Sequence, residues 1–414
     1  MKRRIVITGA GVTSALGYSR QELFQALLDG KSAVKERPEW IELMQTKKMA
    51  IAAGVELPQE VAKAISRHHR RSMGPAALYA TLAAQNALKE ASASSELLNS
   101  GRTGCIASST LGSSSQTYEA AAALVNKVFY DLSACHFFRI VSHSSAFNIA
   151  NYFGINGIQL APCSACASSL QSIGLAYEQI LLGKQDAFIA GGSDETAPVV
   201  IESFRLLHAL AEEPGIPIQQ LSRPFDAKRC GLVCGDGAGM LFIETLEHAQ
   251  ARGAQPLAEI IGYATNCTGA QISQSDHVSI ERCMHLALED AGLSPQDIDY
   301  VSAHATSTVA GDREEAIAIA NVFGGDVPVS SLKGQLGHTL GASGALELSV
   351  VIEMMKHGVI LPNFNLETPS EECAALNLPT APLKKPIKTV LKNCIAFGGV
   401  NAALIIRNIS LPIQ

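Results

Sequence analysis

The sequence has little charge and no long apolar run, and both absences exclude classes of protein. Charged residues make up 17% of the chain and the formal net charge is −6, so no overall positive charge is available to attract nucleic acid. No apolar run approaches the roughly 20 residues of a membrane-spanning helix. The basic N-terminus superficially resembles a signal peptide, but Gly9 and Gly11 interrupt the apolar stretch after it, which predicts a first strand and turn. We expect a soluble, cytoplasmic protein.

Motifs of the common nucleotide and zinc enzymes are missing as well. There is no Walker motif and no His-Glu-x-x-His motif. Gly9-Ala-Gly11 follows an apolar strand, as in a dinucleotide site. However, Ser14 stands where the third glycine would fall, and no acidic residue ends a second strand about 20 residues later. The glycine pair is therefore not interpreted as a dinucleotide site.

The composition that remains describes a large globular protein. Hydrophobic residues make up 47% of the 414 residues, enough for a sizeable core in two domains or one pseudo-duplicated unit. The ten cysteines are scattered along the chain, which predicts reduced thiols and no disulfide scaffold.

Short apolar runs alternate with segments of helical period, which predicts an α/β protein with buried sheets. The expected strands are Arg4–Thr8, Gly104–Ser108, Ile158–Ala161, Ala187–Gly191, Gly239–Glu244, Leu257–Ala264, Tyr300–Ala303, Val327–Ser330, Leu391–Ala396 and Ala402–Ile406. The expected helices are Gln21–Leu28, Pro75–Ala91, Ser168–Leu182, Ser279–Ala291, Arg313–Val322 and Gly341–Lys356. Gln, Arg, Gly and Pro cluster at Ala249–Gln255, which we interpret as a seam between residues 1–250 and residues 251–414.

The strongest local signal for chemistry is the segment Pro162–Ser169, which contains Cys166. It follows an apolar strand and precedes a helical stretch, the setting of a nucleophile elbow. A cysteine at a helix N-terminus feels the positive end of the helix dipole, which predicts a lowered thiol pKa. Three alternatives stay open at this point. The first is that Cys166 is only a small buried apolar residue. Cys163 and Cys166 could form a redox pair or, with Cys230 and Cys234, a zinc site, although the latter spacing is unlike a zinc finger.

Two histidines share the setting of Cys166. His304 ends the apolar strand Tyr300–Ala303, and His338 lies between the strand Val327–Ser330 and the helix Gly341–Lys356. Both lie in loops rich in Gly, Ser and Thr at strand ends, where open α/β sheets place functional groups. The segment Asn393–Asn401 contains a Phe-Gly-Gly turn, which allows unusual backbone angles or is simply a hairpin.

These stretches together resemble the thiolase-fold condensing enzymes, and most closely the elongating β-ketoacyl-(acyl carrier protein) synthases of the second type. The resemblance covers nearly the whole chain. Its motifs follow in family order at Arg4–Val12, the cysteine elbow, Ala190–Gly192, Ser222–Asp226, Gly235–Gly239, the two histidine loops and the Phe-Gly-Gly loop. It implies an α/β thiolase-like fold with two pseudo-duplicated layered halves, arranged α-β-α-β-α.

The resemblance also implies a role for each site residue. Cys166 attacks the thioester of an acyl carrier protein and holds the acyl chain. His304 and His338 promote the decarboxylation of malonyl carrier protein and stabilise the enolate, and we expect them to matter more for this step than for acylation. A thiolate suits thioester exchange, and imidazole donors suit an enolate oxygen.

The remaining implied residues support this centre. Lys333, Glu347 and Glu315 order the histidine network. The backbone N–H groups of Cys166 and Phe397 form the oxyanion hole. The implied gate is formed by Phe397, Gly398 and Gly399, and the implied pantetheine site by Thr306 and Thr308.

The implied partner is an acyl carrier protein, whose phosphopantetheine carries the substrates, and we expect no bound cofactor and no metal. Carrier proteins are acidic, and the best local basic cluster is Arg67, Arg70 and Arg71, with Arg205 as an outside candidate. An ordinary solvated helix face is the alternative interpretation of this cluster.

Several positions depart from the family pattern. Ala305, Ile395 and Ala396 replace the usual glycine, phenylalanine and glycine, and Cys267–Ser275 lacks a loop common in fatty-acid elongases. Such variants resemble ketosynthases of type II polyketide and aryl polyene pathways, which pair with a cysteine-less chain-length partner. The substrate stays open between saturated and polyene chains, and the partner between an identical chain and a homologue.

Other members of the condensing-enzyme class fit the sequence less well. A thiolase uses a second catalytic cysteine in its C-terminal region, where this chain has the Phe397 loop. An initiating synthase has asparagine where this chain has His338. A non-catalytic chain-length subunit is the alternative of another class, and the intact set of Cys166, His304, His338 and Lys333 argues against it.

Overall fold

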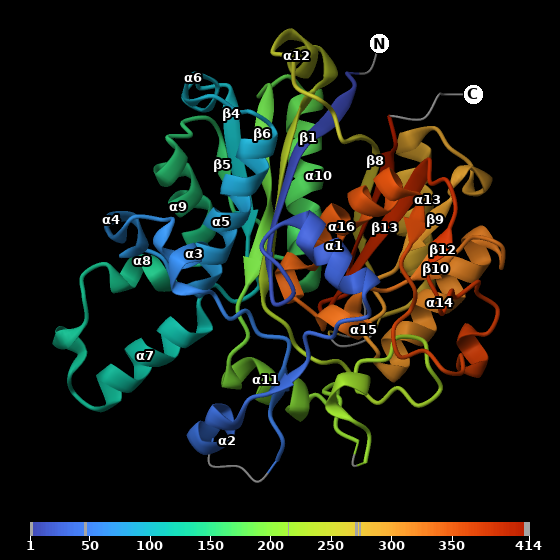
Figure 1. The fold of residues 1–414 in the computed structure, drawn as a ribbon, viewed down its shortest axis with the longest axis horizontal. Coiled ribbons are helices and arrows are strands. Elements are labelled where there is room, and N and C mark those ends of the chain that lie inside the picture. The colour runs from blue at the N-terminus through green and yellow to red at the C-terminus, as the bar shows by residue number, and fades with distance from the viewer. Residues whose placement is uncertain (1–2, 45–47, 214, 270–271, 273–274, 410–414) are drawn as a thin grey trace.

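Ten strands form one continuous mixed sheet in the computed structural model, which describes residues 3–44, 48–213, 215–269, 272 and 275–409 (Figure 1). In chain order these strands are β1 (Ile5–Ser14), β4 (Thr103–Ser108), β5 (Gln159–Leu160), β6 (Ala187–Asp194), β7 (Gly237–Thr245), β8 (Ala258–Cys267), β9 (Tyr300–Ser302), β10 (Val329–Ser330), β13 (Thr389–Ala396) and β14 (Val400–Arg407). Two small two-stranded sheets pair β2 (Lys35–Glu36) with β3 (Ile51–Ala52) and β11 (Val359–Ile360) with β12 (Leu383–Lys384).

The large sheet is an internal duplication. The first half has the order β5-β4-β6-β7-β1 and the second has the order β10-β9-β13-β14-β8, so corresponding strands occupy corresponding places. Strand directions also correspond, because β4 is parallel to β5 and β6 as β9 is parallel to β10 and β13. The halves join where Ile5–Ile7 of β1 pairs with Ala258–Ile260 of β8. The predicted pseudo-duplicated α/β architecture is confirmed.

Helices cover both faces of the two halves and fill the space between them. Helices α5 (Pro75–Glu90) and α9 (Ser144–Phe153) pack on the outer face of the first half. Helices α13 (His277–Ala291) and α14 (Val309–Phe323) form a core with the second half. Helices α10 (Ser168–Leu181) and α16 (Ser343–His357) contact strands of both halves and form the central layer. The resulting order of layers is α-β-α-β-α.

The remaining helices are short or lie at the surface. They are α1 (Arg20–Leu28), α2 (Pro38–Met44), α3 (Gln59–Lys63), α4 (Arg67–Arg70), α6 (Ser95–Leu98), α7 (Ser114–Val125), α8 (His136–Ile140), α11 (Pro198–Leu206), α12 (Leu246–Ala251) and α15 (Lys333–Leu336). No helix of the described residues combines the length and the apolar character needed to cross a membrane.

The glycine pair near the N-terminus serves helix packing. A side chain at Gly9 would lie 2.0 Å from the carbonyl oxygen of Ala87, and one at Gly11 would lie 2.0 Å from that of Ala83. Both carbonyls belong to α5, so the glycines let this alanine-rich helix approach β1 closely. The strand therefore continues to Ser14, and the predicted turn after Thr8 is wrong.

Each predicted strand and helix is present with shifted ends, but helices between the predicted elements were missed. The sequence predicted no element between Ser108 and Ile158, where α7, α8 and α9 lie, and no helix at α11. Many side chains of α7 are exposed, and Figure 1 shows this helix standing apart from the sheet at the lower left. Its apolar residues therefore do not form the one-sided pattern that packing on a sheet requires.

Candidate active site

Cys166 lies in a tight turn between β5 and α10, as the elbow interpretation predicted. The turn is a single 3₁₀ helix, η2 (Ala165–Ala167), and α10 begins directly after it at Ser168. Ala165 adopts a left-handed φ of 44°, a conformation that costs energy for a residue with a side chain. The strained turn aims the next residue, Cys166, at the space between the two halves.

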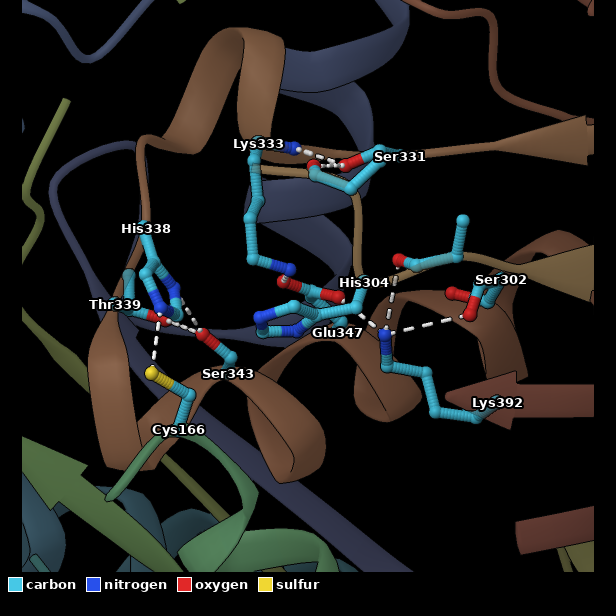
Figure 2. A network of polar contacts seen from close by, with 12 residues as sticks. Cys166, Ser302, His304, Ser331, Lys333, His338, Thr339, Ser343, Glu347 and Lys392 are labelled. Atoms are coloured by element: carbon cyan, nitrogen blue, oxygen red, sulfur yellow. Dashed lines mark hydrogen bonds and ion pairs between the residues drawn. The ribbon is translucent and has the colours of Figure 1, made fainter. Parts of the chain in front are cut away.

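His338 comes from the corresponding turn of the second half. Here η5 (Leu340–Ala342) precedes α16, and Leu340 has a left-handed φ of 49°, close to that of Ala165. The duplication therefore brings two equivalent turns together across the central layer. The Nε2 atom of His338 lies 2.9 Å from the Sγ atom of Cys166, and its Nδ1 atom lies 3.1 Å from the hydroxyl of Ser343 (Figure 2).

His304 follows β9 and completes the centre. Its ring meets that of His338 edge to face, with 5.1 Å between centroids and an interplanar angle of 85°. One donor atom from each of Cys166, His304 and His338 lies within 4.8 Å of the others. The Nδ1 atom of His304 is buried and makes no hydrogen bond within the described residues. His304 lines the cavity beside Cys166, so its ring can contact a ligand bound there.

The backbone around His304 is held by a buried carboxyl group. Glu315 accepts hydrogen bonds from the backbone N–H of His304, at 2.8 Å, and from that of Ala305, at 2.6 Å. The amide of Asn393 also reaches it, at 3.3 Å. Glu315 therefore orients the histidine through its main chain.

A buried ion cluster lies beneath the histidines. Lys333 and Lys392 each place their Nζ atom 2.6 Å from Glu347, on opposite carboxylate oxygens (Figure 2). The sequence predicted the Lys333–Glu347 pair and missed Lys392. The available signal was that Lys392 lies within the predicted buried strand Leu391–Ala396, because a buried charge requires a partner.

One cavity of about 300 Å³ lies at this centre. Cys166, His304 and His338 lie on its wall, together with Thr306, Thr308, Glu315 and Phe397. Thr306 and Thr308 lie 3.1 Å apart, hydroxyl to hydroxyl. The cavity therefore brings the predicted pantetheine and gate residues to the reactive centre.

The Phe-Gly-Gly segment is the turn of a hairpin between β13 and β14, and it combines the two predicted features of this motif, a hairpin and unusual backbone angles. Gly398 and Gly399 have φ values of 89° and 73°, which favour glycine. Phe397 is 36% exposed, and its ring lies 5.9 Å from that of Phe204. The hairpin thereby brings an aromatic residue to the cavity wall.

Family comparisons agree with this geometry. Residues 2–249 match the family described as beta-ketoacyl synthase, N-terminal domain, and residues 257–367 match beta-ketoacyl synthase, C-terminal domain. The chain belongs to the β-ketoacyl synthase family.

Individual members of the β-ketoacyl synthase family are similar over their full length. The chain is 35% identical over 410 residues to 3-oxoacyl-[acyl-carrier-protein] synthase 1 of Escherichia coli (strain K12), with 98% of this chain and 99% of that protein covered. A solved beta-ketoacyl synthase from Burkholderia phymatum has a TM-score of 0.92 at 39% identity, covering 99% of this chain and 100% of that chain. The ishigamide ketosynthase/chain length factor structure has a TM-score of 0.90 at 30% identity, with the same coverage.

The electrostatics of this β-ketoacyl synthase correct one prediction. Burial raises the pKa of the Cys166 thiol to about 12, and the nearby Lys333 only partly offsets this. The predicted lowering of the thiol pKa is wrong, because the cost of burying a thiolate outweighs the helix dipole. Burial first, and then Lys333, holds the pKa of both His304 and His338 well below the usual value, so both imidazoles are neutral at physiological pH.

The raised thiol pKa predicts the pH dependence of Cys166 modification. Alkylation by iodoacetamide is expected to rise about tenfold per pH unit between about pH 6 and pH 9, because only the thiolate reacts. Peptide mass spectrometry of timed samples measures the rate, with Cys166→Ala supplying the background from other cysteines. A rate that is already at its plateau near neutral pH would contradict the prediction.

The alternative roles of the Cys163–Cys166 pair find no support in the geometry. All ten cysteines are free thiols. Cys163 is exposed, its Sγ atom lies 3.5 Å from the carbonyl of Thr110, and it does not line the cavity. Within the described residues, the donor atoms of Cys163, Cys230 and Cys234 do not gather as a metal site requires. Cys166, His304 and His338 do gather, but the two lysine cations beside them disfavour a divalent ion.

The basic residues proposed for docking divide into two groups. Arg67 and Arg71 are exposed and Arg70 is half-buried, in and just after α4. Arg205 is buried and forms ion pairs with Glu202 and, at 2.6 Å, with Glu212. Because its charge is already neutralised inside the protein, the suggestion that Arg205 docks a carrier protein is wrong.

Proposed function

We propose that this chain is a β-ketoacyl-(acyl carrier protein) synthase that condenses an acyl chain held on Cys166 with malonyl carrier protein. The observation that supports this most is the 2.9 Å contact between the Cys166 thiol and His338, with His304 beside them in one cavity. A nucleophile in contact with a base is the requirement for transfer of an acyl group from a thioester. A non-catalytic chain-length subunit needs neither.

In the first half-reaction, Cys166 takes the acyl group from the carrier. The thiol proton passes to Nε2 of His338 as the sulfur attacks the thioester carbonyl, and the pantetheine thiolate takes up the proton as it leaves. Backbone N–H groups of Cys166 and Phe397 stabilise the oxyanion, and Gly398 and Gly399 let the gate move. Thr306 and Thr308 hold the pantetheine arm.

In the second half-reaction, the malonyl group loses carbon dioxide. The electron pair of the broken carbon–carbon bond forms an enolate, whose oxygen accepts hydrogen bonds from His304 and from Nε2–H of His338. The neutral His338 ring exchanges its proton from Nδ1 to Nε2 between the two half-reactions. The enolate carbon attacks the acyl thioester, and Cys166 leaves as a thiolate that takes a proton from solvent. Lys333, Glu347 and Glu315 keep the imidazoles in place.

Product analysis tests the proposed reaction. The protein is incubated with malonyl carrier protein and a panel of acyl carrier proteins, and the products are identified by mass spectrometry. We expect β-ketoacyl carrier protein lengthened by an acetyl unit. A conjugated acyl chain competing with a saturated one in the same assay distinguishes polyene from fatty-acid elongation, because Ile395 and Ala396 reshape the wall next to Phe397. An acyl adduct on Cys166 without any condensation product would contradict the proposal.

We propose a dimer with a second chain of this fold, either identical or a chain-length factor. Strand β5 is at the end of the sheet, so one edge has no neighbouring strand within the described residues. Exposed apolar side chains surround α7 and α8: Leu124, Val125, Val128, Phe129, Tyr130, Phe137 and Phe138. Exposed apolar patches of this kind mark protein interfaces. The ishigamide structure, which is named as a ketosynthase with a chain length factor, provides a precedent.

Two further assignments are proposals of the same kind. We divide the chain into an N-terminal half, residues 1–250, that carries the cysteine, and a C-terminal half, residues 251–414, that carries both histidines. The repeated strand order supports this division. We assign the enzyme to the cytoplasm because its ten cysteines are free thiols.

Reversing the charges of Arg67, Arg70 and Arg71 to Glu is expected to raise the KM for carrier-bound substrates about tenfold at low salt, since the carrier is acidic. Steady-state kinetics at several salt concentrations measures the effect, which should shrink as salt screens the parent enzyme. A matched control reverses three cations elsewhere: Arg282, Lys384 and Lys388. An unchanged KM at low salt, or an equal rise in KM in the control variant, would show that the carrier protein does not dock at α4.

A further inference from the structure

Lys392 is a second buried cation in the active site. It lies in the middle of β13 with a fully buried side chain. Its Nζ atom has three acceptors: Glu347 at 2.6 Å and the backbone carbonyls of Ser302 at 3.4 Å and Ala303 at 3.3 Å. All three ammonium protons therefore have partners (Figure 2).

Burying the ammonium group of Lys392 is energetically unfavourable, which suggests that the charge has a function. Burying an ammonium group carries a desolvation penalty comparable to the gain from a good ion pair. Glu347 is already paired with Lys333, at 2.6 Å, so one carboxylate is shared by two cations. Burial lowers the pKa of Lys392, but Glu347 outweighs this and keeps the pKa above its usual value, so the group stays charged. An apolar residue would hold the strand more cheaply.

The contacts of Lys392 lead directly to His304. Ser302 ends β9 and Ala303 is the residue before His304, so the two carbonyls belong to the segment that carries the histidine. Glu315 holds the same segment from the other direction, through the backbone N–H of His304 and Ala305. The main chain at His304 is thus fixed by a cation on its carbonyls and a carboxyl group on its N–H groups.

We propose that Lys392 is a positioning residue for decarboxylation, which fixes the segment carrying His304 and adds a second buried positive charge beneath the developing enolate. The inference rests on the proposed condensation. An enolate is an anion formed in a site with little water, where a fixed cation stabilises it more than water would. During acylation of Cys166, charge develops at the turn η2 beside His338. Acylation therefore depends on Lys392 less than decarboxylation does.

The charge also affects the protonation of the imidazoles. Titratable and charged groups that act on the two rings or contact their partners come from several elements: Cys166, Glu315, Lys333, Glu347, Lys392 and Cys394. After burial and Lys333, Lys392 contributes to the low pKa of both His304 and His338. Without Lys392, the pKa values of both histidines rise. A protonated imidazole would bind the malonyl carboxylate and slow the release of carbon dioxide. The acid limb of the rate profile then moves to higher pH.

Lys392→Met tests the inference, because methionine keeps much of the volume and removes the charge. Decarboxylation of malonyl carrier protein at neutral pH is expected to fall at least about tenfold. The acid limb of the pH–rate profile for decarboxylation should move to higher pH. The rate of acyl loading on Cys166 should stay within about threefold of the parent rate. Lys384→Met, on an exposed lysine of β12, is the matched control and should change neither.

Lys392→Gln separates the two parts of the role and serves if the methionine variant does not fold. Glutamine keeps N–H donors for the carbonyls but carries no charge, so it should recover part of the rate while the acid limb stays displaced. A parent-like rate and profile in a folded Lys392→Met variant would overturn the inference. So would equal losses of loading and decarboxylation with an unmoved acid limb. An inactive parent enzyme would instead contradict the proposed function.

Discussion

Cys166→Ala is expected to abolish acyl transfer, with a loss of more than about 10³-fold, whereas Cys163→Ala retains most of it. The two cysteines are three positions apart, yet only Cys166 lines the cavity and contacts His338, at 2.9 Å. Cys163 is exposed and lies against the carbonyl of Thr110. The reason is geometric, because the nucleophile must reach both the thioester and the base.

Intact-protein and peptide mass spectrometry after incubation with acyl carrier protein measures this expectation. The acyl adduct should appear on the peptide containing Cys166 and should disappear in Cys166→Ala. Cys230→Ala is a second control, because Cys230 also lines the cavity and could accept an acyl group if proximity alone sufficed. An adduct that persists on Cys163 in the Cys166→Ala variant, with activity preserved, would show that the assignment is wrong.

His304→Ala is expected to lower decarboxylation of malonyl carrier protein by roughly 10²- to 10³-fold, the cost of removing one oxyanion donor. Loading of Cys166 should change little, because His304 makes no hydrogen bond to the thiol. His338→Ala should lower both half-reactions, since its Nε2 atom contacts the Cys166 sulfur. The sequence suggested that both histidines matter more for decarboxylation than for loading, but for His338 that expectation relied on a lowered thiol pKa.

Separate rate measurements distinguish the two histidines. Carbon dioxide release from malonyl carrier protein reports decarboxylation, and the adduct on Cys166 reports loading. His285→Ala, on the exposed side of α13, serves as the control variant. Normal carbon dioxide release in both active-site variants would show that neither imidazole stabilises the enolate. A His338→Ala variant that loads at the parent rate would show that the thiol needs no base at that position.

The electrostatic correction changes how the first half-reaction is understood. A thiol whose pKa is raised to about 12 is not a ready thiolate at neutral pH, although it precedes a helix. The imidazole that contacts it is also neutral, because burial holds the pKa of His338 well below its usual value. The resting pair is therefore thiol and imidazole, and charge develops only as the thioester is attacked. The buried thiol and imidazole stay neutral until the bound substrate takes up part of the developing charge.

Much of the site was predictable because its residues lie in short local patterns. A strand, a small-residue turn and a helix are encoded by neighbours in the chain, so Cys166 and His338 could be found at their elbows. The ten strands could be located for the same reason. The end of β1 was misplaced, because Gly9 and Gly11 do not end the strand: they let α5 pack closely on it, and the strand continues to Ser14. Helix α7 could not be found, because it packs little on the sheet and lacks a one-sided pattern.

The sequence by itself determined the strand and helix alternation, the resemblance to condensing enzymes and the three candidate site residues Cys166, His304 and His338, which the fold brings together. The tertiary structure alone decided which charges share a partner: Lys392 and Lys333 are 59 positions apart by their numbers and meet on Glu347. It also decided that Arg205 is buried and that the Cys166 thiol stays protonated. The physical reason is that desolvation and ion pairing depend on the whole environment of a group, which distant segments create when the two halves pack together.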